Sequence, residues 1–275
     1  MKLAMTLLVR DEEDIIAANI EHHMARGVDL IVVTDNGSVD ATVEILSSYE
    51  KQGALRLLHE PTDDYSQARW VTRMARLCAA EGADWVINSD ADEFWWPRTA
   101  PDLKQPFEQL PAEVGVVSVA RHNFPPRPED GRPFFERMTL RDLNSVNSRG
   151  RPLPPKVAHR AHPQAKVRMG NHRVKGPGLD TKIESDEIEI LHFPMRTFAQ
   201  FENKIVKGGR ALAANTRMSK GKVGTWRELY ALWQEGGLRE HYDAEVVPSG
   251  AQPEGFVEDT RVRDFLRTPT HGRPA

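Results

Sequence analysis

Residues 85–94 read WVINSDADEF and decide the fold of this 275-residue chain. The apolar run from Trp85 to Ile87 is typical of a buried strand, and three carboxylates follow it within four positions. In open α/β sheets a ligand binds beyond the carboxyl ends of the strands. Asp90 and Asp92 point the same way if the strand continues, because side chains alternate along a strand. Two carboxylates this close repel unless one is protonated or a cation lies between them, so we expect a divalent cation.

The chain before this stretch alternates between strand and helix patterns. The apolar runs that predict strands are residues 3–9, 30–33, 55–58 and 85–88. Apolar residues at helical spacing separate these runs, and Asp11 is predicted to be the N-cap of the first helix. The alternation predicts a mostly parallel, doubly wound α/β sheet, whose right-handed connections bring the carboxyl ends of the strands to one edge. We therefore expect the polar residues that follow the strands to meet there. They are Arg10, Asp35, Asp90 and Asp92.

The pattern becomes irregular after residue 97. Further strands are predicted at residues 116–119 and 188–191, with short β-like pieces at 134–140, 156–160 and 166–169. We expect residues 121–187 to form an irregular or antiparallel insert that covers the site as a flap.

The C-terminal part is expected to be helical. Thr197 and Gln200 form a capping box that opens a helix, and residues 225–234 predict another helix. The expected organisation is one domain over residues 1–210 and a helical extension over residues 211–275.

Charge is distributed unevenly along the chain. Residues 1–120 hold 10 Lys and Arg against 21 Asp and Glu, net −11, whereas residues 121–175 hold 13 against 4, net +9. A basic segment can bind nucleic acid, but a single-strand platform also needs aromatic residues among the basic ones, and this segment has few. We therefore expect acidic ligands such as sugar diphosphates, and no nucleic acid.

The cysteine content and hydropathy point to a reducing compartment. The single cysteine, Cys78, excludes an intramolecular disulfide and a thiolate zinc site, so a cytoplasmic location is expected. The apolar run at residues 3–9 is too short to cross a bilayer. We expect no transmembrane segment, and peripheral contact with a membrane stays open.

Four segments resemble a known family. They are residues 10–12 (RDE), 35–42 (DNGSVDAT), 90–94 (DADEF) and 191–197 (LHFPMRT), the last followed by Phe201 and Lys204. Together they resemble family 2 glycosyltransferases of the GT-A fold, and more narrowly a bacterial branch with an Asp-x-Asp-Glu-Phe block. The resemblance covers residues 2–98 and 188–210. It implies a GT-A-type single domain in which residues 1–210 bind the nucleotide sugar and carry out catalysis, with residues 121–187 as an insert on the acceptor side.

The resemblance also implies a role for each matching residue. Asp35 would bind the nucleotide base or ribose, and Asp90 would lie near the ribose and the metal. Asp92 would bind the Mn²⁺ or Mg²⁺ that bridges the diphosphate of a UDP- or GDP-linked donor, and His192 would complete the metal shell. Gln67 replaces part of a Gly/Ala/Asn segment of the family, and we expect it to contact the nucleotide.

Several residues near these motifs have two interpretations. Arg10 either binds the diphosphate or pairs with a neighbouring acid, and Asp35 either binds the nucleotide or stabilises its own turn. Trp95, directly after the acidic block, either stacks on a sugar ring or packs in the core. Glu93 should point opposite to Asp92, so we expect a structural role for it.

The resulting hypothesis is an inverting, metal-dependent transfer of a sugar from a nucleoside diphosphate sugar to an acceptor hydroxyl. Asp92 would act in catalysis through the metal, and a carboxylate or histidine would remove the acceptor proton. The candidates for this base are Glu136, Asp142, His172 and Asp186. We expect His172 to be catalytic, and the acceptor to be a glycan or a lipid-linked molecule.

Two other classes of protein were weighed against this hypothesis. In phosphatases with an Asp-x-Asp motif the triplet follows the first strand and precedes Thr or Val, whereas here it follows the fourth strand and Phe94 takes that place. Metal-dependent phosphoryl transfer is therefore disfavoured. A catalytically inactive module that binds a nucleotide sugar or a glycan stays open, and slow hydrolysis of a donor would distinguish the two.

Overall fold

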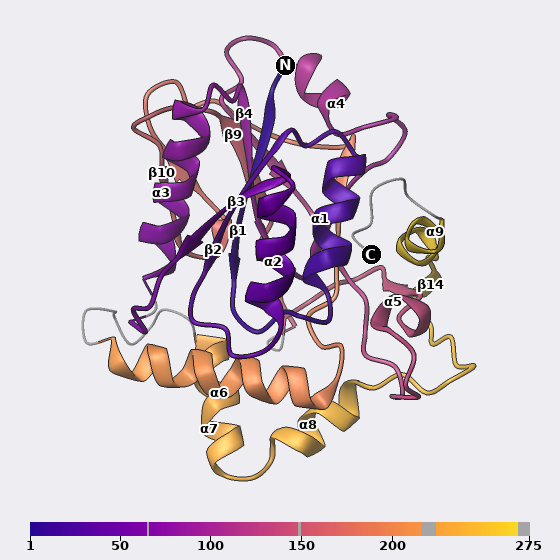
Figure 1. Ribbon diagram of the computed structural model, residues 1–275. Coiled ribbons are helices and arrows are strands. Elements are labelled where there is room, and N and C mark those ends of the chain that lie inside the picture. Colours follow the sequence, from indigo (N-terminus) through magenta and orange to yellow (C-terminus); the bar gives the residue numbers. More distant parts are fainter. Residues whose placement is uncertain (65, 148–149, 216–223, 269–275) are drawn as a thin grey trace.

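The computed structural model describes residues 1–64, 66–147, 150–215 and 224–268 (Figure 1). In chain order the helices are α1 (Ile16–Ala25), α2 (Thr42–Lys51), α3 (Gln67–Ala80), α4 (Lys104–Glu108), α5 (Phe134–Arg137), the 3₁₀ helix η1 (Met169–Asn171), α6 (Phe198–Ala214), α7 (Gly224–Gln234), α8 (Leu238–Glu245) and α9 (Arg261–Arg267). The strands are β1 (Leu3–Val9), β2 (Leu30–Asp35), β3 (Leu55–His59), β4 (Trp85–Asp90), β5 (Glu93–Pro97), β6 (Val116–Val119), β7 (Arg121–Asn123), β8 (Leu140–Asp142), β9 (Lys156–Arg160), β10 (Lys166–Val167), β11 (Val174–Lys175), β12 (Lys182–Glu184), β13 (Ile188–His192) and β14 (Phe256–Glu258).

A seven-stranded sheet in the order β12-β6-β9-β4-β1-β2-β3 forms the centre of the molecule. The first four strands run parallel, as do β6 and β12, whereas β9 is antiparallel to both of its neighbours. The prediction of a mostly parallel α/β sheet is confirmed, and the first four strands begin where the apolar runs place them.

Helices cover both faces of this sheet, as the term doubly wound requires. Leu3 and Met5 of β1 pack in one core cluster with Ile16 of α1, whereas Ala4 packs in a second cluster with Met74 of α3. Neighbouring residues of a strand point to opposite faces, so the short apolar runs are buried on both sides. Each fully buried apolar side chain contributes about 1.5–3 kcal/mol, which explains why these runs are the most reliable signal in the sequence.

The insert differs from the expected flap in two places. The predicted strand at residues 134–140 is wrong, because residues 134–137 form α5: Phe134 packs against Phe193, and the Arg137 guanidinium donates to the Arg196 carbonyl at 2.9 Å. The other difference is β9, which lies inside the central sheet between β4 and β6 with Val157 and Ala158 fully buried. Part of the insert therefore belongs to the hydrophobic core and does not cover the site.

A second sheet, in the order β5-β13-β7, brings distant segments of the chain together. Its register places His192 of β13 opposite Glu93 of β5 and beside Asn123 of β7. The end of β13 is thereby fixed next to the acidic block that follows β4.

Helix α6 crosses the molecule beneath the carboxyl ends of the parallel strands (Figure 1). Its predicted cap is confirmed, because the Gln200 N–H donates to the Thr197 hydroxyl at 3.1 Å. The predicted cap of the first helix is wrong: α1 begins only at Ile16, and Asp11 has a positive φ of 53°. The Asp11 carboxylate instead accepts from Asn203 of α6 at 3.0 Å, which fastens α6 to the loop after β1. No helix of the described segments is long and apolar enough to span a bilayer.

Candidate functional site

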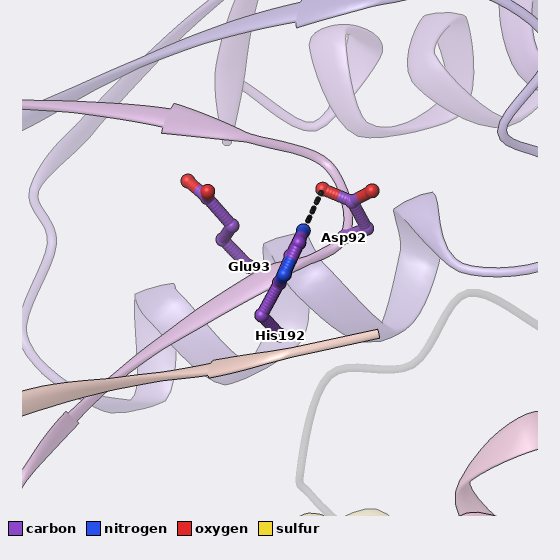
Figure 2. A group of neighbouring side chains, drawn as sticks. All are labelled: Asp92, Glu93 and His192. Carbon is purple, nitrogen blue, oxygen red and sulfur yellow. Dashed lines mark ion pairs between the residues drawn. The ribbon is translucent and has the colours of Figure 1, made fainter. Parts of the chain in front are cut away.

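Asp92 and His192 face each other at the carboxyl edge of the central sheet (Figure 2). Asp92 lies in the turn between β4 and β5 and is only 2% exposed, and His192 ends β13. The Phe193 N–H donates to the Asp92 carbonyl at 2.9 Å, which holds the two segments together. His192 Nε2 then lies 3.6 Å from Asp92 Oδ1.

The imidazole of His192 has the orientation that a metal ligand needs. Its Nδ1–H donates to Asn123 Oδ1 at 2.7 Å, so in the neutral ring the lone pair is on Nε2, the nitrogen that faces Asp92. A lone pair that faces a carboxylate is repulsive unless a cation or a proton lies between them. Metal-binding histidines are usually oriented by such a hydrogen bond to the second nitrogen. This pair therefore fits the divalent cation that the resemblance implies.

Lys204 of α6 pairs with the other oxygen of Asp92, at 2.5 Å from Oδ2. Burial by itself raises the pKa of Asp92, but the Lys204 ammonium, joined by His192 when its ring is protonated, outweighs burial and holds this pKa well below its usual value. Burial lowers the pKa of Lys204, and Asp92 and Glu12 reverse that effect and raise it. Both groups are therefore charged throughout the neutral pH range.

Arg196 connects this site to the loop after β1. It is fully buried, and its guanidinium lies 2.5 Å from Glu12 Oε2 and 2.6 Å from Asp14 Oδ2. Burial raises the pKa of Glu12 despite the opposing attraction of Arg196 and Lys204. The pair of carboxylates on one buried guanidinium fixes the segment that follows His192 against the first loop.

Asp90 has partners of its own. Lys156 of β9 pairs with its Oδ2, and Asn171 of η1 donates to its Oδ1 at 3.0 Å. Among the described residues, the carboxylate and imidazole ligands that come within 4.8 Å of one another belong to Asp92, Glu93 and His192, and Asp90 is not in this group. We expected Asp90 and Asp92 to share one cation. The structure places the two carboxylates apart, because β4 ends at Asp90 and the chain turns before the strand alternation can continue.

Glu93 holds this turn in place. Its side chain is fully buried, and its Oε2 accepts from the Asp90 N–H at 3.1 Å. Lys156 and Arg121 lie 3.1 and 3.3 Å from its Oε1 and neutralise the buried charge. These contacts fit the structural role that we expected from the sequence.

His172 and Gln67 lie beside the partners of Asp90. The His172 Nδ1–H donates to the Pro155 carbonyl at 2.8 Å, which leaves a lone pair on Nε2. Burial, followed by the nearby Lys156, lowers the pKa of His172 to about 4, so the ring is neutral at physiological pH. Gln67 accepts from the Gly170 N–H at 3.0 Å. Gly170 has φ +75°, and a Cβ there would lie 2.5 Å from the His172 ring.

The two residues expected at the donor side both have protein partners. Asp35 is nearly buried, and it accepts from the Gly37 and Ser38 N–H groups at 3.2 Å, which is the turn-stabilising interpretation of this residue. Arg10 pairs with Asp63 at 2.7 Å, an acid outside the neighbouring loop. Both residues follow strands at the expected edge of the sheet.

Trp95 differs from its expected role at the site. The side chain is fully buried, and its indole N–H donates to the Ser89 hydroxyl at 3.1 Å. A ring without exposed surface has no face on which a sugar can stack, so Trp95 belongs to the core. The strand β5 continues directly after the acidic block and carries this side chain inward.

The structure places the four candidate bases in different parts of the molecule. Glu136 pairs with Arg267 on α9, which holds the pKa of this carboxyl below its usual value. Asp142 of β8 accepts from the Asn144 N–H at 2.8 Å, and Asp186 is exposed between β12 and β13. Of the four, His172 is the one that lies beside the acidic block.

Three residues of the site carried no signal of their own in the sequence: Asn123, Lys156 and Asn171. All three belong to the insert, and each reaches the site through a long-range pairing of strands or loops. Lys156 stands first in a buried strand, and an isolated lysine at such a position could have suggested a buried acidic partner. Asn171 has a positive φ of 61°, a strained backbone conformation that only the structure reveals.

Comparison with known proteins identifies the family of this chain. The family model described as glycosyl transferase family 2 matches residues 8–165, and the chain belongs to this family. It is therefore a glycosyltransferase, with the mixed α/β architecture and largely parallel sheet of the GT-A type. No curated protein matches the chain in sequence.

Several solved structures are similar to this chain. One is S. aureus TarS 1–349 in complex with UDP-GlcNAc, with 14% identity and a TM-score of 0.48 over 90% of this chain and 84% of that chain. A second is a mycobacterial protein, with 18% identity and a TM-score of 0.42 over 81% and 77%. A third is Mycobacterium tuberculosis glucosyl-3-phosphoglycerate synthase in complex with Mn²⁺, UDP-glucose and phosphoglyceric acid, with 18% identity and a TM-score of 0.36 over 58% and 57%.

Proposed function

We propose that this glycosyltransferase transfers a sugar from a nucleoside diphosphate sugar to an acceptor hydroxyl, and that Asp92 and His192 hold the divalent cation that the reaction needs. The observation that carries the proposal is the pairing of the two side chains. A buried carboxylate faces an imidazole lone pair at 3.6 Å, and Asn123 fixes the ring. Of the two expected ions, the imidazole favours Mn²⁺, since Mg²⁺ takes oxygen ligands.

When bound, the cation would offset the charge that develops on the leaving diphosphate. Lys204, whose side chain is 28% exposed, supplies a second positive charge beside Asp92. Its raised pKa keeps the ammonium protonated, so it can pair with a phosphate oxygen of the donor. The proximity of Lys204 and Asp92 directs both groups at the same part of the substrate.

In this proposal His172 removes the proton of the acceptor hydroxyl, and the configuration at the anomeric carbon of the transferred sugar is inverted. Its Nδ1–H is fixed by the Pro155 carbonyl, and its pKa of about 4 leaves Nε2 an acceptor at neutral pH. A base that is held in one tautomer can take a proton without reorienting. Asp90 and Asn171, which surround this ring, would then position the acceptor side of the site.

The test is the binding of UDP- and GDP-linked sugars, measured by isothermal titration with and without Mn²⁺. Asp92→Asn keeps the size of the side chain and removes its charge, and we expect it to abolish the metal-dependent part of binding. Asp180→Asn, which removes an exposed carboxylate far along the chain, is the matched control. Equal and metal-independent binding by wild type and Asp92→Asn would refute the metal site.

The catalytically inactive binding module considered from the sequence is at odds with the family assignment, and donor hydrolysis tests it directly. Slow hydrolysis of the bound donor by the wild type, lost in Asp92→Asn and kept in Asp180→Asn, supports an enzyme. Tight donor binding without any hydrolysis or transfer would favour the module.

A further inference from the structure

A basic groove lies on the surface that α3 shares with β10 and β11, and the site described above does not use it. Two adjoining hollows of about 600 and 540 Å³ form the groove, and they share Arg76, Lys166 and Arg168 in their lining. The basic residues that line one or both hollows are Arg69, Arg73, Arg76, Lys166, Arg168 and Lys175. Neither lining includes a carboxylate.

The fold brings these like charges together although their repulsion lowers its stability. Lys166 of β10 is directly opposite Lys175 of β11 in an antiparallel pair, and like charges at such positions are destabilising. Thr72 of α3 keeps β10 in place, since its hydroxyl accepts from the Val167 N–H at 3.0 Å and donates to the Val167 carbonyl at 3.3 Å. Arg76 likewise donates to the Ala165 carbonyl at 3.0 Å. The groove is therefore a built surface and not a set of loose side chains.

Most of the basic residues lack an acidic partner. The described residues include one ion pair within the groove, between Arg73 and Glu60 at 3.4 Å, and none for Lys166, Arg168 or Lys175. Other basic residues of the +9 segment are engaged elsewhere: Lys156 pairs with acids of the site, and Arg160 donates to the Val114 and Pro111 carbonyls. Lys166, Arg168 and Lys175 bring their positive charges together in the groove, where one sign of charge in a hollow concentrates anions.

The groove begins next to the acceptor side of the proposed site. Gln67 at the start of α3 accepts from the Gly170 N–H, and the next residue, Ala68, lines the groove. Arg168 is two positions before Gly170 in the loop that carries His172. In Figure 1, α3 and β10 lie side by side, and α3 begins at the same edge of the sheet as the site.

We propose that this groove binds the anionic part of the acceptor, a chain that carries several phosphate groups. This proposal rests on the proposed function, because it treats the groove as an extension of the acceptor side. A nucleic acid fits less well, since no aromatic residue lines either hollow. A membrane surface also fits less well, because the surface is concave and the exposed large hydrophobic residues of the described chain lie elsewhere.

The experiment uses inorganic polyphosphate as the probe. Fluorescence anisotropy measures its binding to the wild type and to a triple variant, Lys166→Gln/Arg168→Gln/Lys175→Gln, over a range of salt concentrations. The matched control is Lys51→Gln/Lys182→Gln/Arg239→Gln, which removes the same charge from exposed positions on α2, β12 and α8. We expect the groove variant to bind more weakly than the control, with a salt dependence lower by about 2, because each single-strand contact contributes roughly 0.7 to the slope.

Binding of the sugar donor is the measurement that assigns the outcome. Binding of the nucleoside diphosphate sugar should be equal in all three proteins and unaffected by polyphosphate. If the groove variant also loses the donor, the groove is part of the donor pocket and the proposal is wrong. If the wild type binds no donor, the proposed function fails, but polyphosphate binding still tests the groove.

The last comparison is between ligand classes. The wild type should bind polyphosphate and not co-sediment with vesicles of phosphatidylserine and phosphatidylcholine, and it should bind a single-stranded oligonucleotide of equal charge no better than polyphosphate. Preference for the vesicles or the oligonucleotide, or equal polyphosphate binding by the groove and control variants, would overturn the proposal.

Discussion

Asp90 and Asp92 are two positions apart in the sequence and have different surroundings in the structure. Asp92 is almost fully buried, and its partners His192 and Lys204 come from segments about a hundred residues later. Asp90 has a side chain that is 32% exposed, and its partners Lys156 and Asn171 come from the insert. The turn after β4 sends the two carboxylates into separate environments.

The difference teaches which half of the site is suited to a cation. On the Asp92 side, an oriented imidazole offers a lone pair, and the carboxylate keeps its charge at low pH. Each carboxylate pairs with a lysine ammonium, Asp92 with Lys204 and Asp90 with Lys156, but among the described residues no imidazole nitrogen lies within 4.0 Å of Asp90. The nearby imidazole of His172 is neutral and has a free nitrogen. The first side is therefore suited to a metal and the second to a base. The predictions below separate the two sides.

The largest effect is expected from Arg196→Met, on the Asp92 side. This variant leaves Glu12 buried without its partner and leaves Asp14 with none, so the free energy of unfolding should fall by about 3–5 kcal/mol. Lys156→Met is the matched change on the Asp90 side. It should cost less, about 1–3 kcal/mol, because Asp90 is partly solvated and Glu93 keeps Arg121.

Urea denaturation of both variants at pH 7 measures this difference. Arg239→Met, which removes an exposed pair with Asp243, is the control and should change the free energy by less than about 1 kcal/mol. A larger loss for Lys156→Met than for Arg196→Met would show that the Asp90 side, not the Asp92 side, carries the more strongly buried charge.

The second prediction compares two asparagines. Asn123→Ala removes the acceptor that orients His192, and the affinity for Mn²⁺ should fall by about 10–100-fold, as for other residues that orient metal ligands. Asn171→Ala removes the corresponding support of Asp90 and should leave Mn²⁺ affinity unchanged. Titration of Mn²⁺ by its electron paramagnetic resonance signal gives both values. Equal losses would mean that both carboxylates bind the metal.

The sequence predicted one side of this comparison better than the other. The four early strands are short apolar runs whose spacing determines a parallel sheet, so Asp90 and Asp92 could be placed at its carboxyl edge. His192 could be added only through its resemblance to the family. Lys204 was named only as part of the family resemblance, with no role assigned to it; its pairing with Asp92 had no local signal, although its place on the capped helix α6 was predicted.

The insert could not be predicted in the same way. Its strands are two to five residues long and pair over long distances, so neither the place of β9 in the central sheet nor the register of β7 beside β13 follows from local patterns. The burial of Trp95 has a similar cause. It depends on the pairing of β5 with β13, which lies about a hundred residues away.

The third prediction concerns Gly170, which supports the Asp90 side alone. Gly170→Ala meets two obstacles, a positive φ of 75° and a Cβ that would lie 2.5 Å from the His172 ring. Gly131→Ala meets only the first, since φ is +81° and nothing lies within 4 Å of its Cβ. Both should lose about 1–3 kcal/mol of stability from backbone strain.

The kinetic comparison isolates the effect on His172. Gly170→Ala should also lower kcat, because the ring must move, whereas Gly131→Ala should keep wild-type kcat. Neither variant should change Mn²⁺ affinity. Wild-type kcat in a folded Gly170→Ala protein would argue against His172 as the base.

The smallest effect is expected from a change of pH. The lowered pKa of His172, about 4, keeps the ring neutral in the folded protein, so its contribution to stability is complete above the unfolded value of about 6.5 and is lost as the pH falls toward 4. At pH 5.5 a base with an ordinary pKa would keep only about a tenth of its neutral form, whereas His172 stays almost entirely neutral. At saturating Mn²⁺, kcat should therefore change by less than about twofold between pH 7 and 5.5. Lys156→Met removes a positive charge that helps to lower this pKa, so it should move the acid limb of the profile to higher pH. An acid limb near pH 6.5 in the wild type, or one that Lys156→Met does not move, would assign the base to a residue outside the Asp90 side.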